Sequence, residues 1–385
     1  MVEWGLERMV RYYIKCLRCG EKLPAKTWIW RHDKDGGTLS ITYRGLEKHG
    51  LSELLLKEYM DIRRYINILP VSLKYLNIAP IGFTPIINRK FRGVNVFFKL
   101  DYLLPSGSFK DRGALVSIAK AKELRIKRII EDSSGNAGVA FSLYSLLYNI
   151  EANIFIPADV PSGKKALLKS LNARLHEVQG SREEVNRAAI DFEHRSRGAY
   201  VGHWWNPFFI EGVKTLAYEI HEQLGMDKVD SIIVPTSSGS LLLGIFKGIM
   251  ELKTMGEISN IPKLIAVQAS GYARLCYELG YGMGAEKSKL ADGLRIVEPP
   301  RIGEMVLAVR ETKGTCYHVT DEEVAEGLKK LWSMGFLVEP TSAVVYAALK
   351  KAISEKVVEK GENVVIILTG SGAKMLDKVL SIVRT

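Results

Sequence analysis

The chain has 385 residues, 47% of them hydrophobic and 25% charged, with a formal net charge of +11. This length is more than one ordinary core serves, so we expect two or three domains. No apolar run approaches a membrane span, no signal-peptide-like segment opens the chain, and no dense basic block with interleaved aromatic residues occurs. We therefore expect a cytoplasmic globular protein that binds neither membrane nor nucleic acid. Four cysteines, only two of them closely spaced, do not indicate a disulfide framework.

Residues 11–45 are predicted to form a small separate element. Cys16-Leu-Arg-Cys19 has the C-x-x-C spacing that is typical of a zinc knuckle. A second cysteine pair would be expected further on, but His32 and Asp35 stand there instead. Two interpretations stay open: one zinc ion per chain held by these four residues, or a ribbon that has lost its metal. The site residues named below therefore include no metal ligand.

A helix is expected over residues 46–59, and a buried strand ends at Val96–Leu100. The stretch Pro105–Gly113 follows, and the alternation over Ala114–Leu124 predicts an amphipathic helix. Lys110 is thus placed where a strand gives way to a helix, beside the positive end of the helix dipole. Such surroundings lower a lysine pKa, and a lysine that is partly neutral can attack a carbonyl and form an imine.

Strand–loop–helix units recur along the rest of the chain. The predicted strands are 128–132, 152–157, 231–235 and 363–368, and the helices begin near residues 139, 162 and 241. This alternation predicts an α/β fold with mostly parallel sheets covered on both faces. Ligands bind such sheets at the carboxyl ends of the strands, which is where the small and polar residues of this chain gather.

Three loops at predicted strand ends offer ligand contacts. The small residues of Thr236–Leu241 let backbone N–H groups converge on a phosphate at a helix N-terminus, although a plain Ser/Gly turn is the alternative. Asn136 offers an amide, and Thr369 and Ser371 offer hydroxyls, at two further predicted strand ends.

Four sequence words in this order resemble the pyridoxal-phosphate enzymes of the tryptophan-synthase-β type (fold type II), and among them the threonine synthases most closely. They are Ser-Phe-Lys-Asp-Arg-Gly around Lys110, Ser134-Gly-Asn-Ala-Gly138, Thr236-Ser-Ser-Gly-Ser240 and Thr369-Gly-Ser-Gly372. Some members of this group also carry an N-terminal ribbon. The resemblance implies pyridoxal 5'-phosphate as the cofactor and an amino acid, which can be phosphorylated, as the substrate.

The resemblance also assigns roles to residues. It implies that Lys110 forms the Schiff base and moves protons at Cα, that Asn136 holds the ring oxygen, and that Thr369, with Ser371 as the weaker match, meets the ring nitrogen. The phosphate cup would consist of Ser237, Ser238, Gly239, Ser240 and Leu241. The substrate contacts would come from Ser108, Ser134, Gly135, Ala137, Gly138 and the position of Phe209.

The fold that the resemblance implies has two open, mostly parallel α/β domains with the cofactor between them, behind the ribbon-like element. The predicted divisions are residues 1–45 for the ribbon, 46–100 with 207–385 for the large domain, and 101–206 for the small domain. A homodimer is also expected.

One segment departs from the family pattern. Asn206–Gly212 resembles a stretch written N-P-x-R-x-E-G, in which the arginine binds the substrate phosphate, but this chain has Phe209 there and Trp204 nearby. Either another basic group binds the anion, or the substrate is not O-phosphohomoserine, or these aromatics are core residues. The alternatives are therefore a serine/threonine dehydratase, a cysteine- or cysteate-synthase-type β-replacement enzyme, and a catalytically silent cofactor-binding protein.

Overall fold

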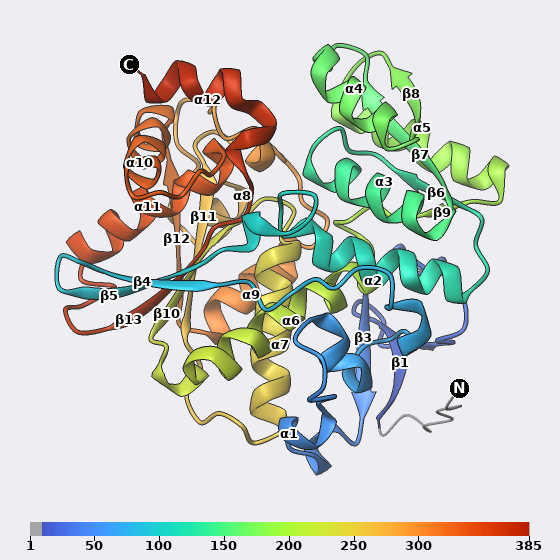
Figure 1. Ribbon diagram of the computed structural model, residues 1–385, viewed down its shortest axis with the longest axis horizontal. Helices are drawn as coiled ribbons and strands as arrows, with labels where there is room; N and C mark the ends of the chain where they lie inside the picture. Colours follow the sequence, from blue (N-terminus) through green and yellow to red (C-terminus); the bar gives the residue numbers. More distant parts are fainter. Residues whose placement is uncertain (1–9, 385) are drawn as a thin grey trace. The chain divides into compact units, whose positions relative to one another are not determined.

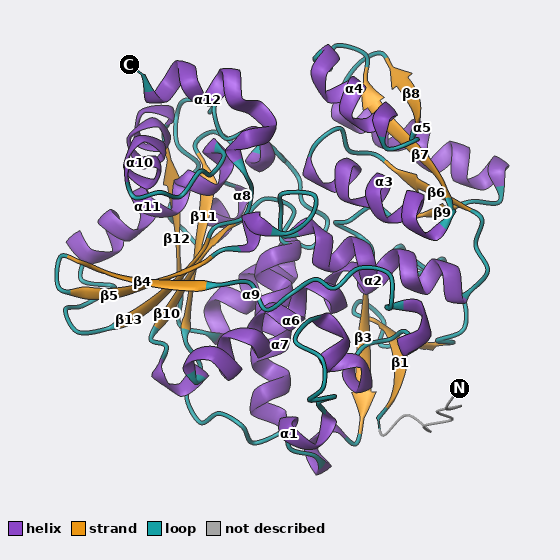
Figure 2. Ribbon diagram, in the orientation of Figure 1, coloured by secondary structure: helices purple, strands orange, loops and turns teal. Residues whose placement is uncertain are grey.

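The computed structural model describes residues 10–384 (Figures 1 and 2). These residues divide into two compact units. Unit 1 comprises residues up to Gly82 together with Arg112–Thr215 and Met250–Ile258. Unit 2 comprises Phe83–Asp111, Leu216–Ile249 and the segment from Ser259 onward. Within the described range, no helix is both long enough and apolar enough to cross a membrane.

Unit 1 contains two sheets. The first is antiparallel, with strand order β2-β1-β3, and lies where the ribbon was predicted; whether it is a zinc ribbon stays a prediction. The second is fully parallel, with order β8-β7-β6-β9. The strands are β1 (Arg11–Cys16), β2 (Lys22–Leu23), β3 (Leu39–Arg44), β6 (Arg128–Glu131), β7 (Glu151–Pro157), β8 (Arg174–Val178) and β9 (Ala199–Tyr200).

The helices of unit 1 cover the parallel sheet. Helix α3 packs on β6 and β7, and α5 packs on all four strands. A small core of Ile130, Phe155, Val185 and Tyr200 joins this layer to Trp30. The helices are α1 (Leu51–Leu54), α3 (Asn136–Tyr148), α4 (Ser162–Ser170) and α5 (Arg182–Ser196).

Unit 2 is built on a six-stranded sheet of order β12-β11-β10-β13-β5-β4, in which only β4 is antiparallel. Every residue of β10 is buried, as expected for a parallel strand covered on both faces. The strands are β4 (Ile86–Phe91), β5 (Val94–Lys99), β10 (Ser231–Pro235), β11 (Lys263–Ala269), β12 (Thr315–Val319) and β13 (Asn363–Ile367). The predicted α/β class with mostly parallel sheets is confirmed.

Helix α11 packs across β10 to β13, and α9 packs on β11 and β12. The helices of unit 2 are α8 (Arg274–Glu278), α9 (Ile302–Glu311), α10 (Asp321–Ser333), α11 (Pro340–Ser354) and α12 (Leu376–Val383). Cys276 on α8 and Cys316 on β12 form a disulfide, which the sequence analysis did not foresee. Three further helices contain the unit boundaries: α2 (Lys110–Glu123), α6 (Pro207–Leu224) and α7 (Ser240–Thr254).

One predicted element is wrong. The helix expected over residues 46–59 is replaced by a 3₁₀ turn at Leu46–Lys48 and the single turn of α1. Gly45 adopts a left-handed conformation at φ 78°, and Gly50 is extended at ψ 153°, so the backbone leaves the helical region on both sides of the short turn. The further 3₁₀ helices are Ile62–Ile68, Leu73–Tyr75, Asp101–Leu103, Met226–Lys228, Asp292–Leu294 and Gly372–Met375.

Candidate functional site

Unit 2 contains a cavity, partly open to solvent, next to the carboxyl ends of β10 and β13. Its lining brings together three predicted features: Lys110 at the start of α2, the loop residues Ser237–Leu241, and Thr369. The other lining residues are Phe109, Pro235, Thr236, Gly293, Leu294 and Thr341.

Lys110 is half-buried, and its Nζ lies 3.8 Å from the centroid of the Phe109 ring. Backbone contacts fix the chain just before it. The Phe109 N–H donates to the Thr369 carbonyl (3.0 Å), and the fully buried Ser108 pairs with Gly370 in an isolated antiparallel bridge. These contacts tie the lysine to the end of β13. The lowered pKa expected for Lys110 stays a prediction.

The loop after β10 is built as the sequence predicts. The Thr236 N–H donates to a carbonyl of β11 (2.7 Å), and α7 begins at Ser240. Gly239 has φ +90°, and a Cβ there would lie 2.5 Å from the Met305 sulfur, so the turn requires glycine. The Ser237 hydroxyl oxygen is buried and has no hydrogen-bond partner within the described part of the chain. Together with the positive end of α7, this loop is suited to an anion.

Thr369 follows β13 and is 2% exposed. Its N–H donates to the Ser342 hydroxyl (2.8 Å), whereas its own Oγ1 finds no partner among residues 10–384. Gly370 lies against Glu339, where a Cβ would come within 2.2 Å of the carboxylate. Ser371 is not among the lining residues, and its hydroxyl accepts a backbone N–H of the following 3₁₀ helix. Of the two predicted hydroxyls, Thr369 therefore lines the cavity.

A second lysine near this stretch was not foreseen. Lys374 Nζ donates to the carbonyls of Gly107 (2.9 Å) and Ser106 (3.2 Å), which precede Lys110 by a few residues. Burial lowers the pKa of Lys374, although the negative charge of Glu339 acts in the opposite direction. No sequence signal marks Lys374, because its partners are carbonyls of a distant segment.

The predicted loop Ser134–Gly138 lies in unit 1, between β6 and α3. Asn136 is the first residue of α3, and the Gly135 N–H donates to the Ser133 hydroxyl (3.2 Å). A Cβ at Gly138 would lie 1.9 Å from the Ser133 carbonyl oxygen, so only glycine fits there. Ala137 and Gly138 are buried, and the others are half-buried. Because this loop and Lys110 belong to different units, their meeting in one site stays a prediction.

Phe209 is a core residue of unit 1. Its side chain is fully buried, and a Cβ at Gly113 would lie 2.4 Å from its ring. Its ring centroid lies 5.9 Å from those of Phe141 and His203. Trp204 is 9% exposed and donates from Nε1 to the Tyr200 hydroxyl (3.2 Å). Phe209 is thus an interior residue, as the core interpretation expects, with one polar neighbour: the His203 imidazole, which pairs with the buried Glu131 carboxylate at 2.9 Å.

The Arg182 guanidinium lies over the Trp204 ring in a cation–π contact. Its guanidinium carbon lies 4.8 Å from the Trp204 ring centroid, and Nη1 pairs with Asp132 at 2.9 Å. Asp132 directly precedes the Ser133–Gly138 loop and is buried. Burial tends to lower the pKa of Arg182, but the Asp132 carboxylate outweighs it and the net direction is upward. The guanidinium is therefore permanently charged beside the predicted substrate loop.

Comparison with known proteins gives consistent results. Residues 79–370 match the family described as "Pyridoxal-phosphate dependent enzyme". The chain is 30% identical over 375 residues to a threonine synthase of Methanosarcina acetivorans, covering 93% of this chain and 91% of that protein. It is also 30% identical over 383 residues to a threonine synthase of Methanocaldococcus jannaschii, covering 95% and 94%. The processed form of threonine deaminase isoform 2 from Solanum lycopersicum has the same fold, with a TM-score of 0.66 at 21% identity over 78% of this chain and 83% of that one.

Proposed function

Because the chain belongs to the family of pyridoxal-phosphate dependent enzymes and is a lyase of that family, we propose that it eliminates or replaces a group at Cβ or Cγ of an amino acid, in the manner of a threonine synthase. The observation that carries the proposal is the 30% identity to two threonine synthases over more than nine-tenths of this chain. The rival activities are those of a serine/threonine dehydratase and of a cysteine- or cysteate-synthase-type enzyme.

The residues of the unit 2 cavity fit pyridoxal phosphate. The buried hydroxyls of Ser237 and Thr369 have no partner in the described chain, and a phosphate and a pyridine nitrogen would provide one for each. Backbone N–H groups of Ser238–Leu241 at the α7 N-terminus would bind the phosphate, and Lys110 would hold the cofactor covalently. Asn136 would hydrogen-bond the ring oxygen.

When bound, the cofactor supplies an electron sink for the amino acid attached to it. The protein's part is then positioning and proton transfer. Lys110 Nζ would take the proton from Cα and return it, since it is the lysine that lines the cavity. The uncharged Thr369 hydroxyl would leave the ring nitrogen without an added proton, which favours elimination and replacement. The N–H groups of Ser134–Gly138 would receive the substrate carboxylate.

The absence of an arginine at position 209 bears on the choice of substrate. An arginine fork on a phosphate contributes charge-assisted hydrogen bonds worth roughly 1.5–3 kcal/mol each. Its replacement by a buried phenylalanine should weaken O-phosphohomoserine capture by about tenfold to a thousandfold. We expect elimination or replacement on a less charged amino acid to be at least competitive.

The test is to measure kcat/KM side by side for O-phosphohomoserine, threonine, serine and O-phosphoserine. A kcat/KM for O-phosphohomoserine that exceeds the others by orders of magnitude would refute the argument from Phe209. Another cation would then bind the phosphate, and Arg182 is the candidate. Arg182→Met should then reduce kcat/KM for the phosphorylated substrates alone, while Arg187→Met, an exposed change in the same helix, should have no effect. No turnover of any amino acid, with cofactor bound, would favour a catalytically silent protein.

A further inference from the structure

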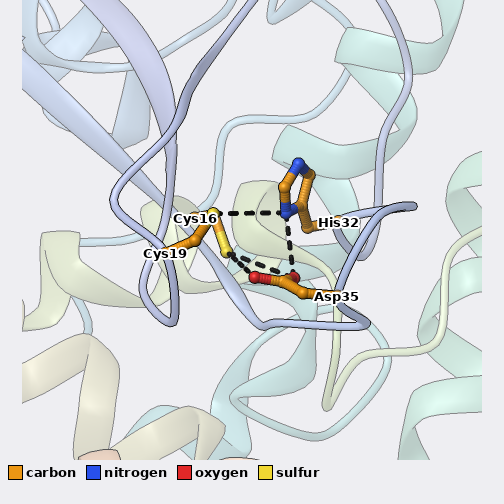
Figure 3. Close-up of side chains that lie close together, drawn as sticks. All are labelled: Cys16, Cys19, His32 and Asp35. Carbon is orange, nitrogen blue, oxygen red and sulfur yellow. Dashed lines mark hydrogen bonds and ion pairs between the residues drawn. The ribbon is translucent and has the colours of Figure 1, made fainter.

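Four potential metal ligands converge in the antiparallel sheet region of unit 1 (Figure 3). Cys16 ends β1, Cys19 lies in the turn to β2, and His32 and Asp35 lie in the loop that leads to β3. One ligand atom from each residue lies within 4.8 Å of all the others. The site is separate from the unit 2 cavity.

The separations have the size of the edges of a metal tetrahedron. Bonds of about 2.3 Å to sulfur and about 2.0–2.2 Å to nitrogen or oxygen give sulfur-to-nitrogen and sulfur-to-oxygen edges of about 3.5 Å. Cys19 Sγ lies 3.5 Å from His32 Nδ1, and Cys16 Sγ lies 3.5 and 3.6 Å from the two Asp35 oxygens. The edge between His32 Nδ1 and Asp35 Oδ1 is shorter, at 2.9 Å, because the two atoms are close enough for a direct hydrogen bond.

Groups around the four ligands hold them in place. The other ring nitrogen of His32 lies 3.4 Å from a carboxylate oxygen of Glu21, the arrangement that orients and polarises metal-bound histidines. Asp35 Oδ1 accepts the N–H of Gly37 (2.7 Å). A Cβ at Gly37 would lie 2.7 Å from Cys16 Sγ and 2.9 Å from Asp35 Oδ1, so glycine makes room for both ligands.

The same loop carries two tryptophans that pack elsewhere in unit 1. Trp28 donates to the Tyr200 carbonyl (3.0 Å) and stacks on Phe208 at the start of α6, with centroids 5.2 Å apart. Trp30 donates to Glu193 (3.0 Å). Fixing the base of this loop therefore fixes its contacts with β9 and α6.

We propose that Cys16, Cys19, His32 and Asp35 bind one zinc ion per chain in a structural site. Two thiolates with an imidazole in a tetrahedral arrangement favour zinc among the divalent metals, and four protein ligands leave no open position for catalysis. The aspartate takes the place of a third thiolate or a second imidazole. The ion cross-links the end of β1 to the loop that carries Trp28 and Trp30.

The experiment measures zinc in the purified full-length protein and then removes it and titrates the metal back in competition with a chromophoric chelator. We expect one zinc per chain. Glu21→Gln removes the carboxylate that orients His32 and should weaken zinc binding by about 10–100-fold. Asp35→Asn removes a metal ligand itself and should weaken zinc binding by at least as much. Asp33→Asn, the same change at an exposed position two residues away, should leave the affinity unchanged.

Zinc removal should also lower the unfolding temperature of the wild type and leave that of Cys19→Ser unchanged. Purified and zinc-reconstituted protein without stoichiometric metal would overturn the proposal. So would equal zinc affinities for Asp35→Asn and Asp33→Asn. Because Asp35 and Glu21 are partly exposed, these variants keep the test decisive even where Cys16→Ser does not fold.

Discussion

Two lysines serve the stretch 105–113 in different ways. Lys110 lines the cavity and could react there, whereas Lys374 donates hydrogen bonds to the carbonyls of Ser106 and Gly107. The first follows from a sequence word that resembles a known family. The second depends on a tertiary contact, because Lys374 and Ser106 are 268 residues apart in the sequence.

Lys110→Ala should reduce turnover by at least about 10²–10⁴-fold, the contribution of a positioned proton-transfer group, because no other residue would hold the cofactor covalently. The fold and noncovalent cofactor binding should largely persist. The measurement is turnover with the best substrate, beside the cofactor content after dialysis and the mass added to Lys110 after borohydride reduction. The control is Lys127→Ala, an exposed change beyond the end of α2, which should behave as wild type. Turnover retained by Lys110→Ala would refute the assignment of Lys110 as the catalytic lysine.

Lys374→Met should destabilise the protein by about 1–3 kcal/mol, because two carbonyls of the 105–113 stretch lose their charged donor. Lys378→Met is the matched control: Lys378 also donates to two backbone carbonyls, but at 3.1 and 3.3 Å and in a more exposed place. Thermal unfolding of both variants would measure the difference, and equal losses would contradict a special role for Lys374.

The pH dependence of this effect has a definite sign. The folded pKa of Lys374 is below the ordinary 10.5, so between these two values the unfolded chain binds more protons than the folded one. Stability from this group therefore rises with pH across that window. Unfolding temperatures of wild type and Lys374→Met, measured from pH 7 to pH 10, should diverge as the pH rises; a constant gap would show that burial does not lower this pKa.

At the scale of elements, α2 and α6 approach closely in unit 1. A Cβ at Gly212 of α6 would lie 2.0 Å from the Arg112 carbonyl oxygen and 2.8 Å from the Cα of Gly113. The approach brings Phe209 over Gly113, so the aromatic side chain fills space that two glycines create. Phe209 and Gly212 thus form one packing arrangement.

Gly212→Ala should cost about 1–3 kcal/mol or more, because backbone atoms cannot move aside as a flexible side chain would. Gly163→Ala, in α4, meets nothing within 4 Å and should instead stabilise the protein by roughly 0.5–1 kcal/mol through the alanine helix preference. Chemical unfolding of the two variants provides the comparison. Similar stabilities would mean that the helices separate readily.

Most strands and helices around the cavity were predictable, because buried parallel strands are continuous apolar runs bounded by small residues. The predicted strand 231–235 matches β10, and the loop after it has the predicted small residues. The prediction of a helix over 46–59 was wrong because it followed the helical spacing of the apolar residues and gave too little weight to Gly45 and Gly50, which interrupt the helix. The burial of Phe209 was one of three open interpretations, since a sequence does not show which aromatic faces a ligand.

On the whole-molecule scale, the disulfide lies entirely in unit 2. It joins positions 40 residues apart, and loop closure of that length contributes up to about 4 kcal/mol of stability. The disulfide stabilises β12 and α8, which contain its two cysteines, and has no direct effect on the sheets of unit 1.

Reduction should therefore increase hydrogen exchange in peptides from residues 263–319, while peptides from residues 128–200 keep their protection and act as the internal control. Mass-spectrometric exchange with and without a thiol reductant measures both together. Equal loss of protection in the two regions would mean that the units unfold as one. No loss in either would mean that the bridge contributes little to stability.

The pairing of β5 with β13 has a consequence for how the protein is made. Asn95 pairs with Asn363, so the centre of the unit 2 sheet joins segments separated by 268 residues. During synthesis β5 leaves the ribosome early and must wait for β13, whereas every segment of unit 1 has emerged once Ile258 is out. Long-range parallel pairing is slow and leaves unpaired edges exposed meanwhile. Because Thr369 follows β13, the cavity around Lys110 is completed only after this late segment has been synthesised, and the nascent chain has no finished place for a cofactor before then.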